Sequence, residues 1–190
     1  VFIHIRFNFL SSVSEMNRNT GLLHFQSALA LQCFTNEYIY HQNDTETEAL
    51  QRLEALVEKT LSNGQQPNSK YVLCLASYKA LYQYEWSNLL TVTSDIEEVF
   101  TQQVIEPKQE ASMKPDIPAL ETVTDKVSYK VREQYEKSPY PRWVNLGLPL
   151  NPEPFSTIAK NLKLRLFDNK ICEIEALDIL IAGCGTGQHS

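Results

Sequence analysis

The sequence predicts a mostly α-helical N-terminal region followed by the start of an α/β domain. Over residues 1–106, and most clearly from residue 20 onward, apolar side chains recur at the three- and four-residue spacing of helices that bury one face. Residues 107–121 contain three prolines and little apolar periodicity, which predicts an extended linker. In residues 122–190, the aliphatic run Ile179–Ala182 leads directly into a glycine-rich loop, a pattern typical of a buried parallel strand that turns into a helix.

Composition narrows the class of protein. The chain has 190 residues, a net charge of −6 and a hydrophobic content of 43%, which suits a folded globular protein rather than a disordered one. The acidic balance argues against a nucleic-acid binder, which needs basic side chains to neutralise phosphates. No apolar run reaches the roughly 18 residues that span a bilayer, so we expect no membrane partner.

The first two elements follow from the pattern of apolar side chains. Val1–Leu10 alternates between apolar and polar residues, which predicts a strand or the tail of a preceding element. Thr20–His41 carries apolar residues at helical spacing with few charges, so we expect a helix that is buried on more than one side.

Two helices are predicted next. Thr45 and Glu48 have the spacing of a capping box, and Asn63–Gly64 is a natural stop, which predicts a helix between them. A further helix is expected over Lys70–Tyr84. The apolar stripe of the first of these helices is Leu50, Leu53, Leu56, Val57 and Leu61.

The remaining elements are less regular. Ser94 and Glu97 predict a second capping box, opening a helix that ends before Pro107. Thr124–Lys137 is expected to be a helix with one apolar face. Phe155–Leu166 fits either a helix or an extended segment, and Asp178–Ala182 is the predicted strand.

The cysteines predict neither a metal site nor a redox motif. No two of them have C-x-x-C spacing, and the four histidines form no ligand cluster. A sparse set of thiols in apolar surroundings indicates a reduced, cytosolic protein. The four cysteines are Cys33, Cys74, Cys172 and Cys184.

The glycine loop carries the chemical information. Glycines after a first parallel strand let a nucleotide-like cofactor approach the backbone, and the N–H groups of the following helix face that ligand. The spacing here is G-x-G-x-G, with Gln188 where a dinucleotide site has its third glycine. This loop is similar to motif I of class I S-adenosylmethionine-dependent methyltransferases, which have a Rossmann-like fold. One departure is Ile181, where many members carry an acidic residue.

A second segment supports the same resemblance. Tyr135–Trp143 reads Y-x-x-x-P-Y-P-R-W, and together with the loop it resembles bacterial methyltransferases that are linked to tetratricopeptide repeats. The resemblance covers residues 125–190 best. It implies that Tyr135–Trp143 folds over the cofactor as a lid, with Arg142 pairing with the cofactor carboxylate. The implied cofactor-binding residues are Gly183, Cys184, Gly185, Thr186, Gly187, Gln188, Tyr135, Tyr140 and Arg142.

The lid segment, Cys184 and His189 each also have a purely structural interpretation. The lid segment also fits a proline-fixed turn in which Trp143 fills the core and Arg142 caps a helix. Cys184 fits a small loop residue better than a nucleophile. His189 fits the first turn of a helix better than a general base.

The resemblance implies the N-terminal part of a methyltransferase that contributes part of the S-adenosylmethionine site. A lone parallel strand needs neighbours, so we expect a longer protein and no turnover by this chain alone. No catalytic base and no methyl acceptor are identified by the sequence. The alternative is a helical protein-interaction module without catalysis, and a dinucleotide-dependent enzyme is a third reading. A homodimer or a protein partner on the helical region would cover apolar surface.

Overall fold

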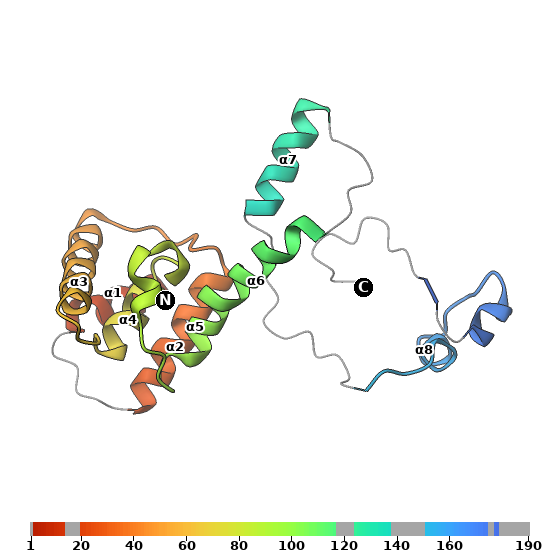
Figure 1. Cartoon of the computed structure of the whole chain (residues 1–190), viewed down its shortest axis with the longest axis horizontal. Helices are drawn as coiled ribbons and strands as arrows, with labels where there is room; N and C mark the ends of the chain where they lie inside the picture. The colour runs from red at the N-terminus through yellow and green to blue at the C-terminus, as the bar shows by residue number, and fades with distance from the viewer. Residues whose placement is uncertain (1, 14–19, 117–123, 138–150, 175–176, 179–190) are drawn as a thin grey trace. The chain divides into compact units, whose positions relative to one another are not determined.

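The residues that the structure describes fold into helices joined by turns (Figure 1). The mostly α-helical class predicted for the N-terminal region is confirmed. The chain divides into two compact units, Val1–Pro141 and Arg142–Ser190. The computed structural model describes residues 2–13, 20–116, 124–137, 151–174 and 177–178, and no strand occurs in these ranges.

The N-terminal unit contains the longer helices. Its α-helices are α1 (Phe2–Ser12), α2 (Thr20–Thr35), α3 (Asp44–Ser62), α4 (Ser69–Ala76), α5 (Glu97–Phe100), α6 (Glu106–Met113) and α7 (Lys126–Lys137). Its described residues also form three 3₁₀ helices, which are wound more tightly than an α-helix: η1 (Leu81–Gln83), η2 (Glu85–Leu89) and η4 (Lys114–Asp116). A fourth segment, η3 (Thr101–Ile105), is a more widely wound π-helical turn. None of the helices in the described ranges is long and apolar enough to cross a bilayer.

The first element differs from its prediction. Residues 2–12 form the helix α1, so the expected strand is wrong. A strand without partners leaves its backbone groups unpaired, whereas a helix pairs them within itself. Leu10 and Val13 are buried at helical spacing, and α1 packs against α3 and α4.

Helices α2 and α7 begin close to their predicted positions. α2 starts at Thr20 as expected and ends at Thr35 rather than near His41. α7 covers Lys126–Lys137, within the predicted range, and the Asp125 carboxylate caps its first turn. Both helices were predicted from periodicity over several turns, which is the strongest local signal for a helix.

The capping box of α3 lies two residues earlier than predicted. The Glu46 backbone N–H donates to the Asn43 side chain at 2.9 Å, and the Asn43 N–H donates to the Glu46 carboxylate at 3.0 Å. The pair Thr45–Glu48 therefore does not form the box. The predicted stop at Asn63–Gly64 is confirmed, and Gly64 has a φ of 72°, a left-handed conformation that favours glycine.

The predicted helix over Lys70–Tyr84 is too long. α4 ends at Ala76, and the hydroxyl of Ser77 donates to the Leu73 and Cys74 carbonyls at 3.0 and 2.9 Å. The chain then turns through η1 and η2. The tighter turns hold the rings of Tyr84 and Trp86 in a stack with centroids 4.6 Å apart.

The predicted helix that opens at Ser94 and ends before Pro107 is also corrected. α5 begins at Glu97 without a side-chain cap, and the chain continues through η3 into α6. Pro107 does not stop the helix, because α6 begins at Glu106. Pro107 is the second residue of α6 and directly follows the π turn η3, so the helical run includes a residue that has no N–H to donate. Residues 107–113 are α-helical and Lys114–Asp116 form the 3₁₀ helix η4, so this part of the predicted linker is not extended. Residues 117–121 of the predicted linker lie outside the described residues.

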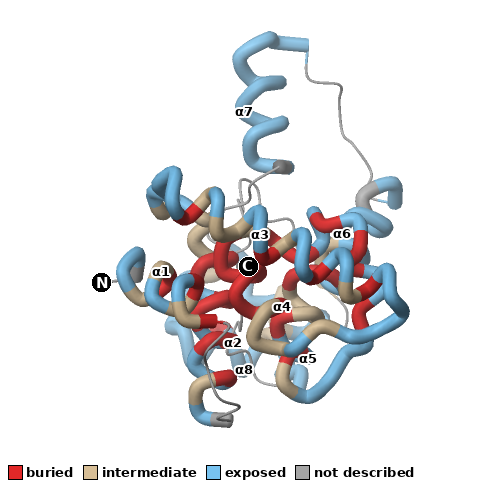
Figure 2. Tube along the Cα trace, turned by 90° about the vertical axis from the view of Figure 1, so that its left-hand side faces the viewer, coloured by how far each residue is buried: buried red, intermediate tan, exposed pale blue. Residues whose placement is uncertain are grey.

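The core of the N-terminal unit lies where α4 packs between α2 and α3 (Figure 2). α1 packs against α3 and α4, and α5 packs against α2. Burying these apolar side chains is the main favourable contribution to folding. The most deeply buried of them are Ala30, Cys33, Val57, Val72, Leu73, Cys74, Leu75, Ala76, Ala80, Leu81, Val99 and Val104.

The C-terminal unit contains α8 (Phe155–Asn161) and η5 (Asn169–Glu173) in its described part. The ambiguous run Phe155–Leu166 is helical only as far as Asn161, and the α8–η5 connection includes Lys163 at a φ of 52°. Of the predicted strand Asp178–Ala182, residues 179–182 lie outside the described residues.

Candidate functional site

Most of the predicted cofactor site lies outside the residues that the structure describes. Tyr135 is the one predicted site residue inside these ranges, and it lies on α7 with its side chain 60% exposed. The structure therefore neither brings the predicted site residues together nor separates them. Those outside the described residues are Tyr140, Arg142, Gly183, Cys184, Gly185, Thr186, Gly187 and Gln188.

Tyr135 lies on the apolar face of an amphipathic helix. Val127, Val131 and Tyr135 follow one another at four-residue spacing, and all three are exposed. The described side chains of α7 are exposed along its whole length (Figure 2). Tyr135 is thus largely exposed on this face of the helix.

The polar face of α7 is held by local contacts. The Arg132 Nε donates to the Glu136 carboxylate at 2.6 Å, one turn away, and this contact raises the pKa of Arg132. At the start of the helix, the Ser128 N–H donates to the Asp125 carboxylate at 2.7 Å. Hydrogen bonds from the Ser128 backbone and hydroxyl lower the pKa of Asp125. The charged groups therefore stabilise the helix itself.

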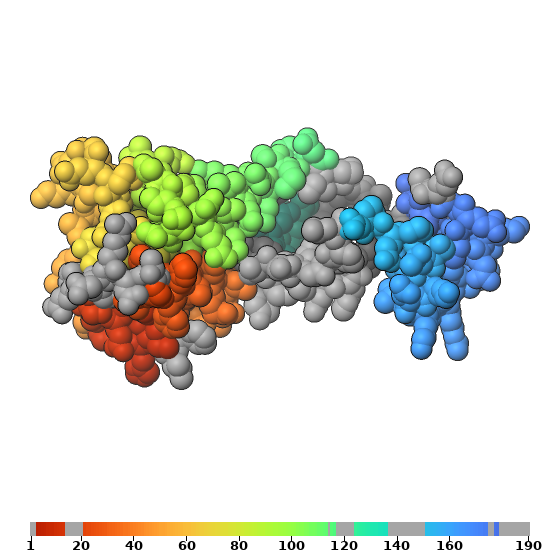
Figure 3. All heavy atoms as spheres, turned by 90° about the horizontal axis from the view of Figure 1, so that it is seen from below, coloured from red at the N-terminus to blue at the C-terminus, as the bar shows by residue number. Residues whose placement is uncertain are grey.

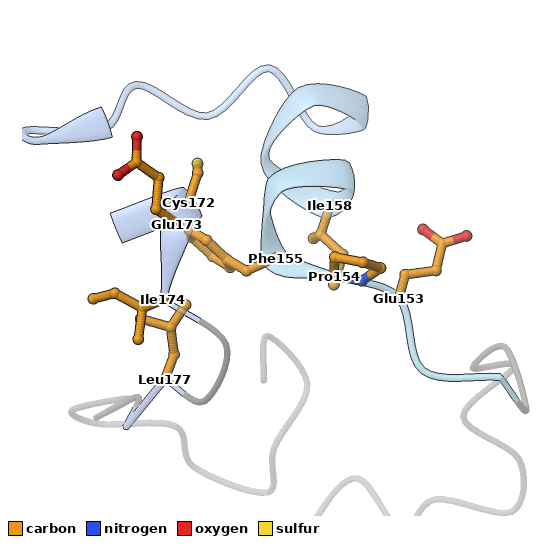
Figure 4. Close-up of a pocket in the computed structure, with 8 residues that line it drawn as sticks. All are labelled: Glu153, Pro154, Phe155, Ile158, Cys172, Glu173, Ile174 and Leu177. Carbon is orange, nitrogen blue, oxygen red and sulfur yellow. The ribbon is translucent and has the colours of Figure 1, made fainter. Parts of the chain in front are cut away.

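A shallow apolar groove of about 500 Å³ lies between α8 and η5 (Figure 4). Phe155 and Ile158 from α8 face Ile174 and Leu177 across it. Its two carboxylates point outward from the apolar floor (Figure 4), so the groove lacks the convergent polar groups that orient a small ligand. The lining residues are Glu153, Pro154, Phe155, Ile158, Cys172, Glu173, Ile174 and Leu177.

The N-terminal unit contains a buried polar cluster that the sequence did not predict. Arg6 and Glu46 are 2% and 1% exposed, and the Arg6 Nη2 lies 3.6 Å from the Glu46 Oε1. The Tyr78 hydroxyl donates to the same oxygen at 2.9 Å. Burial, and then the hydrogen bond to Glu46, raise the pKa of Tyr78 far above its ordinary value, so its hydroxyl stays a donor.

No local signal reveals this cluster. Arg6 belongs to a segment expected to be a strand, and Glu46 is one of several acidic residues at the start of α3. Tyr78 is 32 residues from Glu46 along the chain. Only the packing of α1, α3 and the end of α4 brings the three side chains together.

A second buried polar group, Gln103, connects three elements. Its side-chain oxygen accepts from the Leu81 N–H at 3.0 Å, and its nitrogen donates to the carbonyls of Ala30 and Ala76, both at 3.2 Å. Gln103 lies in the π-helical turn η3 and is fully buried. π turns are rare and often occur at functional sites, but here the turn aims an amide at backbone groups of α2, α4 and η1.

No family model, curated protein or solved structure matches the chain.

Proposed function

We propose that the chain is part of an S-adenosylmethionine-dependent methyltransferase and supplies the glycine loop of its cofactor site. The observation that carries this proposal is the aliphatic run Ile179–Ala182 followed by G-x-G-x-G at residues 183–187. A Rossmann-like domain would begin at this run. The upstream segment Tyr135–Trp143 supports the same function, because it combines aromatic, proline and arginine residues in the order found in the lid of the resembling enzymes.

The proposed roles follow from the chemistry of each residue type. Glycines at 183, 185 and 187 would let the backbone lie against the cofactor, and the following N–H groups would face it. A guanidinium such as Arg142 suits a carboxylate, because two parallel hydrogen bonds form. The 60% exposure of Tyr135 supports a role in the lid. When bound, the cofactor supplies an electrophilic methyl group.

Positioning is the main contribution expected from the protein. Methyl transfer is a direct displacement, so holding the acceptor in line with the methyl group accounts for much of the rate increase. This chain alone is proposed to lack turnover, because no residue in it is identified as a base for the acceptor.

Cofactor binding tests the proposal directly. We would titrate S-adenosylhomocysteine into the protein that carries these residues in their complete reading frame, and follow thermal unfolding. At a ligand concentration 100-fold above Kd, stabilisation of about 2.7 kcal/mol is expected. Gly185→Ala should abolish the shift, because a Cβ would occupy the space of the ligand. Gly21→Ala, at an exposed position of α2, is the matched control and should keep it. No shift in the wild type would refute the proposal.

The second candidate function is a helical interaction module. It is favoured by an apolar surface on the N-terminal unit, where Phe25 of α2 is 47% exposed and Ile3 of α1 is 39% exposed. Phe9 and Phe25 lie in contact, with ring centroids 5.6 Å apart, and Figure 3 shows α1 in red beside α2 in orange-red. This candidate predicts no response to S-adenosylhomocysteine. It also predicts self-association that Phe25→Gln weakens in sedimentation equilibrium.

We also propose a reducing, cytosolic compartment. Cys33, Cys74 and Cys172 are free thiols, and the first two are buried. Free thiols in a stable core are typical of proteins kept in a reducing environment. Mass spectrometry of the protein isolated under alkylating conditions tests this, since an intermolecular disulfide at Cys172 would contradict it.

A further inference from the structure

Helix α1 departs from the usual pattern of a surface helix, in which charged side chains face solvent and apolar side chains face the core. Its only charged side chain, Arg6, is 2% exposed, whereas the apolar Ile3 is 39% exposed. Arg6, Leu10 and Val13 share the helical face that is turned inward, and all three are buried. The contact of α1 with the unit is therefore organised around a guanidinium as well as around apolar side chains.

The groups that receive Arg6 are held in place by residues outside α1. The Glu46 carboxylate accepts the N–H of Asn43 in the capping box at 3.0 Å and the Tyr78 hydroxyl at 2.9 Å. Tyr78 is itself anchored where α4 ends, because its N–H donates to the Leu75 carbonyl at 3.0 Å. The carboxylate and the phenol ring thus keep their positions through contacts that do not involve Arg6.

These groups form a recess that suits a guanidinium. The Arg6 Nη2 donates to the His41 carbonyl at 3.0 Å and lies 3.6 Å from the Glu46 Oε1. The Cζ of Arg6 lies 4.0 Å from the centre of the Tyr78 ring and 5.7 Å from the centre of the Tyr40 ring. A planar guanidinium stacks on aromatic rings while it donates hydrogen bonds at its edge, which an ammonium does not do.

The fit of Arg6 is incomplete. Its Nε is buried and has no hydrogen-bond partner among the described residues. A buried donor without a partner is destabilising, and a buried ion pair adds little net stability even though breaking it is costly. The ion pair therefore fixes where α1 docks more than it adds to the stability of the docked state.

We propose that α1 is a latch, and that Glu46, Tyr78, Tyr40 and the His41 carbonyl form a preformed guanidinium-binding recess that Arg6 fills. The helices α2, α3 and α4 keep their mutual packing when α1 leaves, since α4 contacts both of the others directly. The open recess then binds the guanidinium of another molecule. This inference does not depend on the proposed methyltransferase function.

Chemical rescue tests the recess. In Arg6→Ala, ethylguanidinium at millimolar concentration replaces the missing group, so we expect a saturable rise in the unfolding midpoint of this variant. The wild type should respond only at much higher concentration, because Arg6 competes for the recess. Ethylammonium is the control for charge alone. The double variant Arg6→Ala with Glu46→Gln keeps the capping box, which accepts Gln, and should bind ethylguanidinium at least tenfold more weakly. An equal rise in the unfolding midpoint of the wild type and of Arg6→Ala would refute the proposal of a guanidinium-binding recess.

Hydrogen exchange on the wild-type chain tests the latch without relying on a variant that folds. Amides of α1 should exchange at least tenfold faster than those of Leu73–Leu75 in α4, through an opening that leaves α4 protected. If α1 and α4 exchange at the same rate, α1 opens only with global unfolding and the latch is refuted. This measurement decides the proposal even if Arg6→Ala does not fold.

Discussion

The two units of the chain are both helical, but they differ in burial. In the N-terminal unit, α4 is surrounded by α1, α2 and α3, and Val72–Ala76 is almost completely buried. Among the described residues of the C-terminal unit, Ala159 is the one buried side chain, and Phe167 is fully exposed. Helix content alone therefore does not indicate which unit has a core.

The difference has a physical cause in the elements themselves. α8 has 7 residues and packs on the 5-residue η5, so each side chain meets few neighbours. α3 and α2 have 19 and 16 residues and enclose α4. The N-terminal unit also pairs its buried polar groups at Glu46 and Gln103, which restricts how its helices pack. We expect the N-terminal unit to be the stable one.

Thiol reactivity should show the largest difference between the units. Burial raises the pKa of Cys33 to about 11 and of Cys74 to about 12, while the nearby Arg6 charge opposes part of the rise. Cys172 is half-buried in the C-terminal unit. With iodoacetamide at pH 8, we expect Cys172 to react at least about a thousandfold faster, because the buried thiols react only after opening. Peptide-resolved mass spectrometry measures the three rates.

The raised pKa values of Cys33 and Cys74 also make the stability of the N-terminal unit depend on pH. Each buried thiol has a folded pKa above its ordinary value of 9.0. The stability linked to it is present below pH 9, and it is lost as the pH rises toward 11 and 12. Equal alkylation rates for all three cysteines at pH 8 would contradict the predicted difference in thiol reactivity between the two units.

Truncating a leucine in each unit should give the next largest difference. Leu73→Ala removes a side chain that is 0% exposed, and we expect a loss of about 2–5 kcal/mol in the free energy of unfolding. Leu162→Ala is the matched control, since Leu162 is 66% exposed, and its effect should stay within about 0.5 kcal/mol. Urea unfolding followed by circular dichroism measures both variants. Comparable losses would mean that Leu162 is buried in solution.

Removing the Gln103 amide should have an intermediate effect. Gln103→Ala leaves the Leu81 N–H and the carbonyls of Ala30 and Ala76 without this partner, and we expect a loss of about 2–3 kcal/mol. Gln102→Ala is the control, because it changes the same residue type in the same π turn at a half-buried position. Gln103→Met keeps the volume and should also destabilise. Unchanged urea midpoints for Gln103→Ala and Gln103→Met would show that the amide does not hold η3.

The smallest effect concerns the cap of the exposed helix α7. The pKa of Asp125 lies below its ordinary value because the carboxylate accepts hydrogen bonds from the Ser128 backbone and hydroxyl. The stabilisation of α7 by this cap is therefore present above the ordinary pKa of Asp125 and is lost as the pH falls through the lowered one. An NMR titration of the Asp125 carboxylate and the Ser128 amide measures the pKa of Asp125 and the pH at which the cap is lost. The variant Asp125→Asn is expected to keep the cap and to remove its pH dependence. A normal pKa for Asp125 would refute the contact.

Local sequence signals predicted the elements whose causes are local. The stop of α3 at Asn63–Gly64 follows from backbone conformation, and the start of α2 at Thr20 follows from apolar spacing. The same kind of signal misplaced the cap of α3, because Asn43 and Thr45 are both good capping residues two positions apart. Which of the two residues forms the cap depends on the position of the Glu46 side chain. A hydrogen bond from Tyr78, 32 residues away along the chain, holds that side chain.

The candidate site could be predicted only as a motif. The G-x-G-x-G pattern at residues 183–187 can be read without a structure, and these residues lie outside the described ones. The groove between α8 and η5 could not be read, since Phe155 and Ile174 meet only after the chain has turned at Lys163. The guanidinium recess likewise had no signal in the sequence.

The sequence by itself determined the helical class, the placement of α2, α3 and α7, and the glycine motif, because each depends on residues within one or two turns of one another. The tertiary structure decided that residues 2–12 form a helix, that α4 ends at Ala76, and that Arg6 is buried. These outcomes depend on contacts between residues far apart, such as the pairing of Gln103 with Ala30 across 73 residues. Such contacts form only when whole helices pack, and no window of the sequence contains both partners.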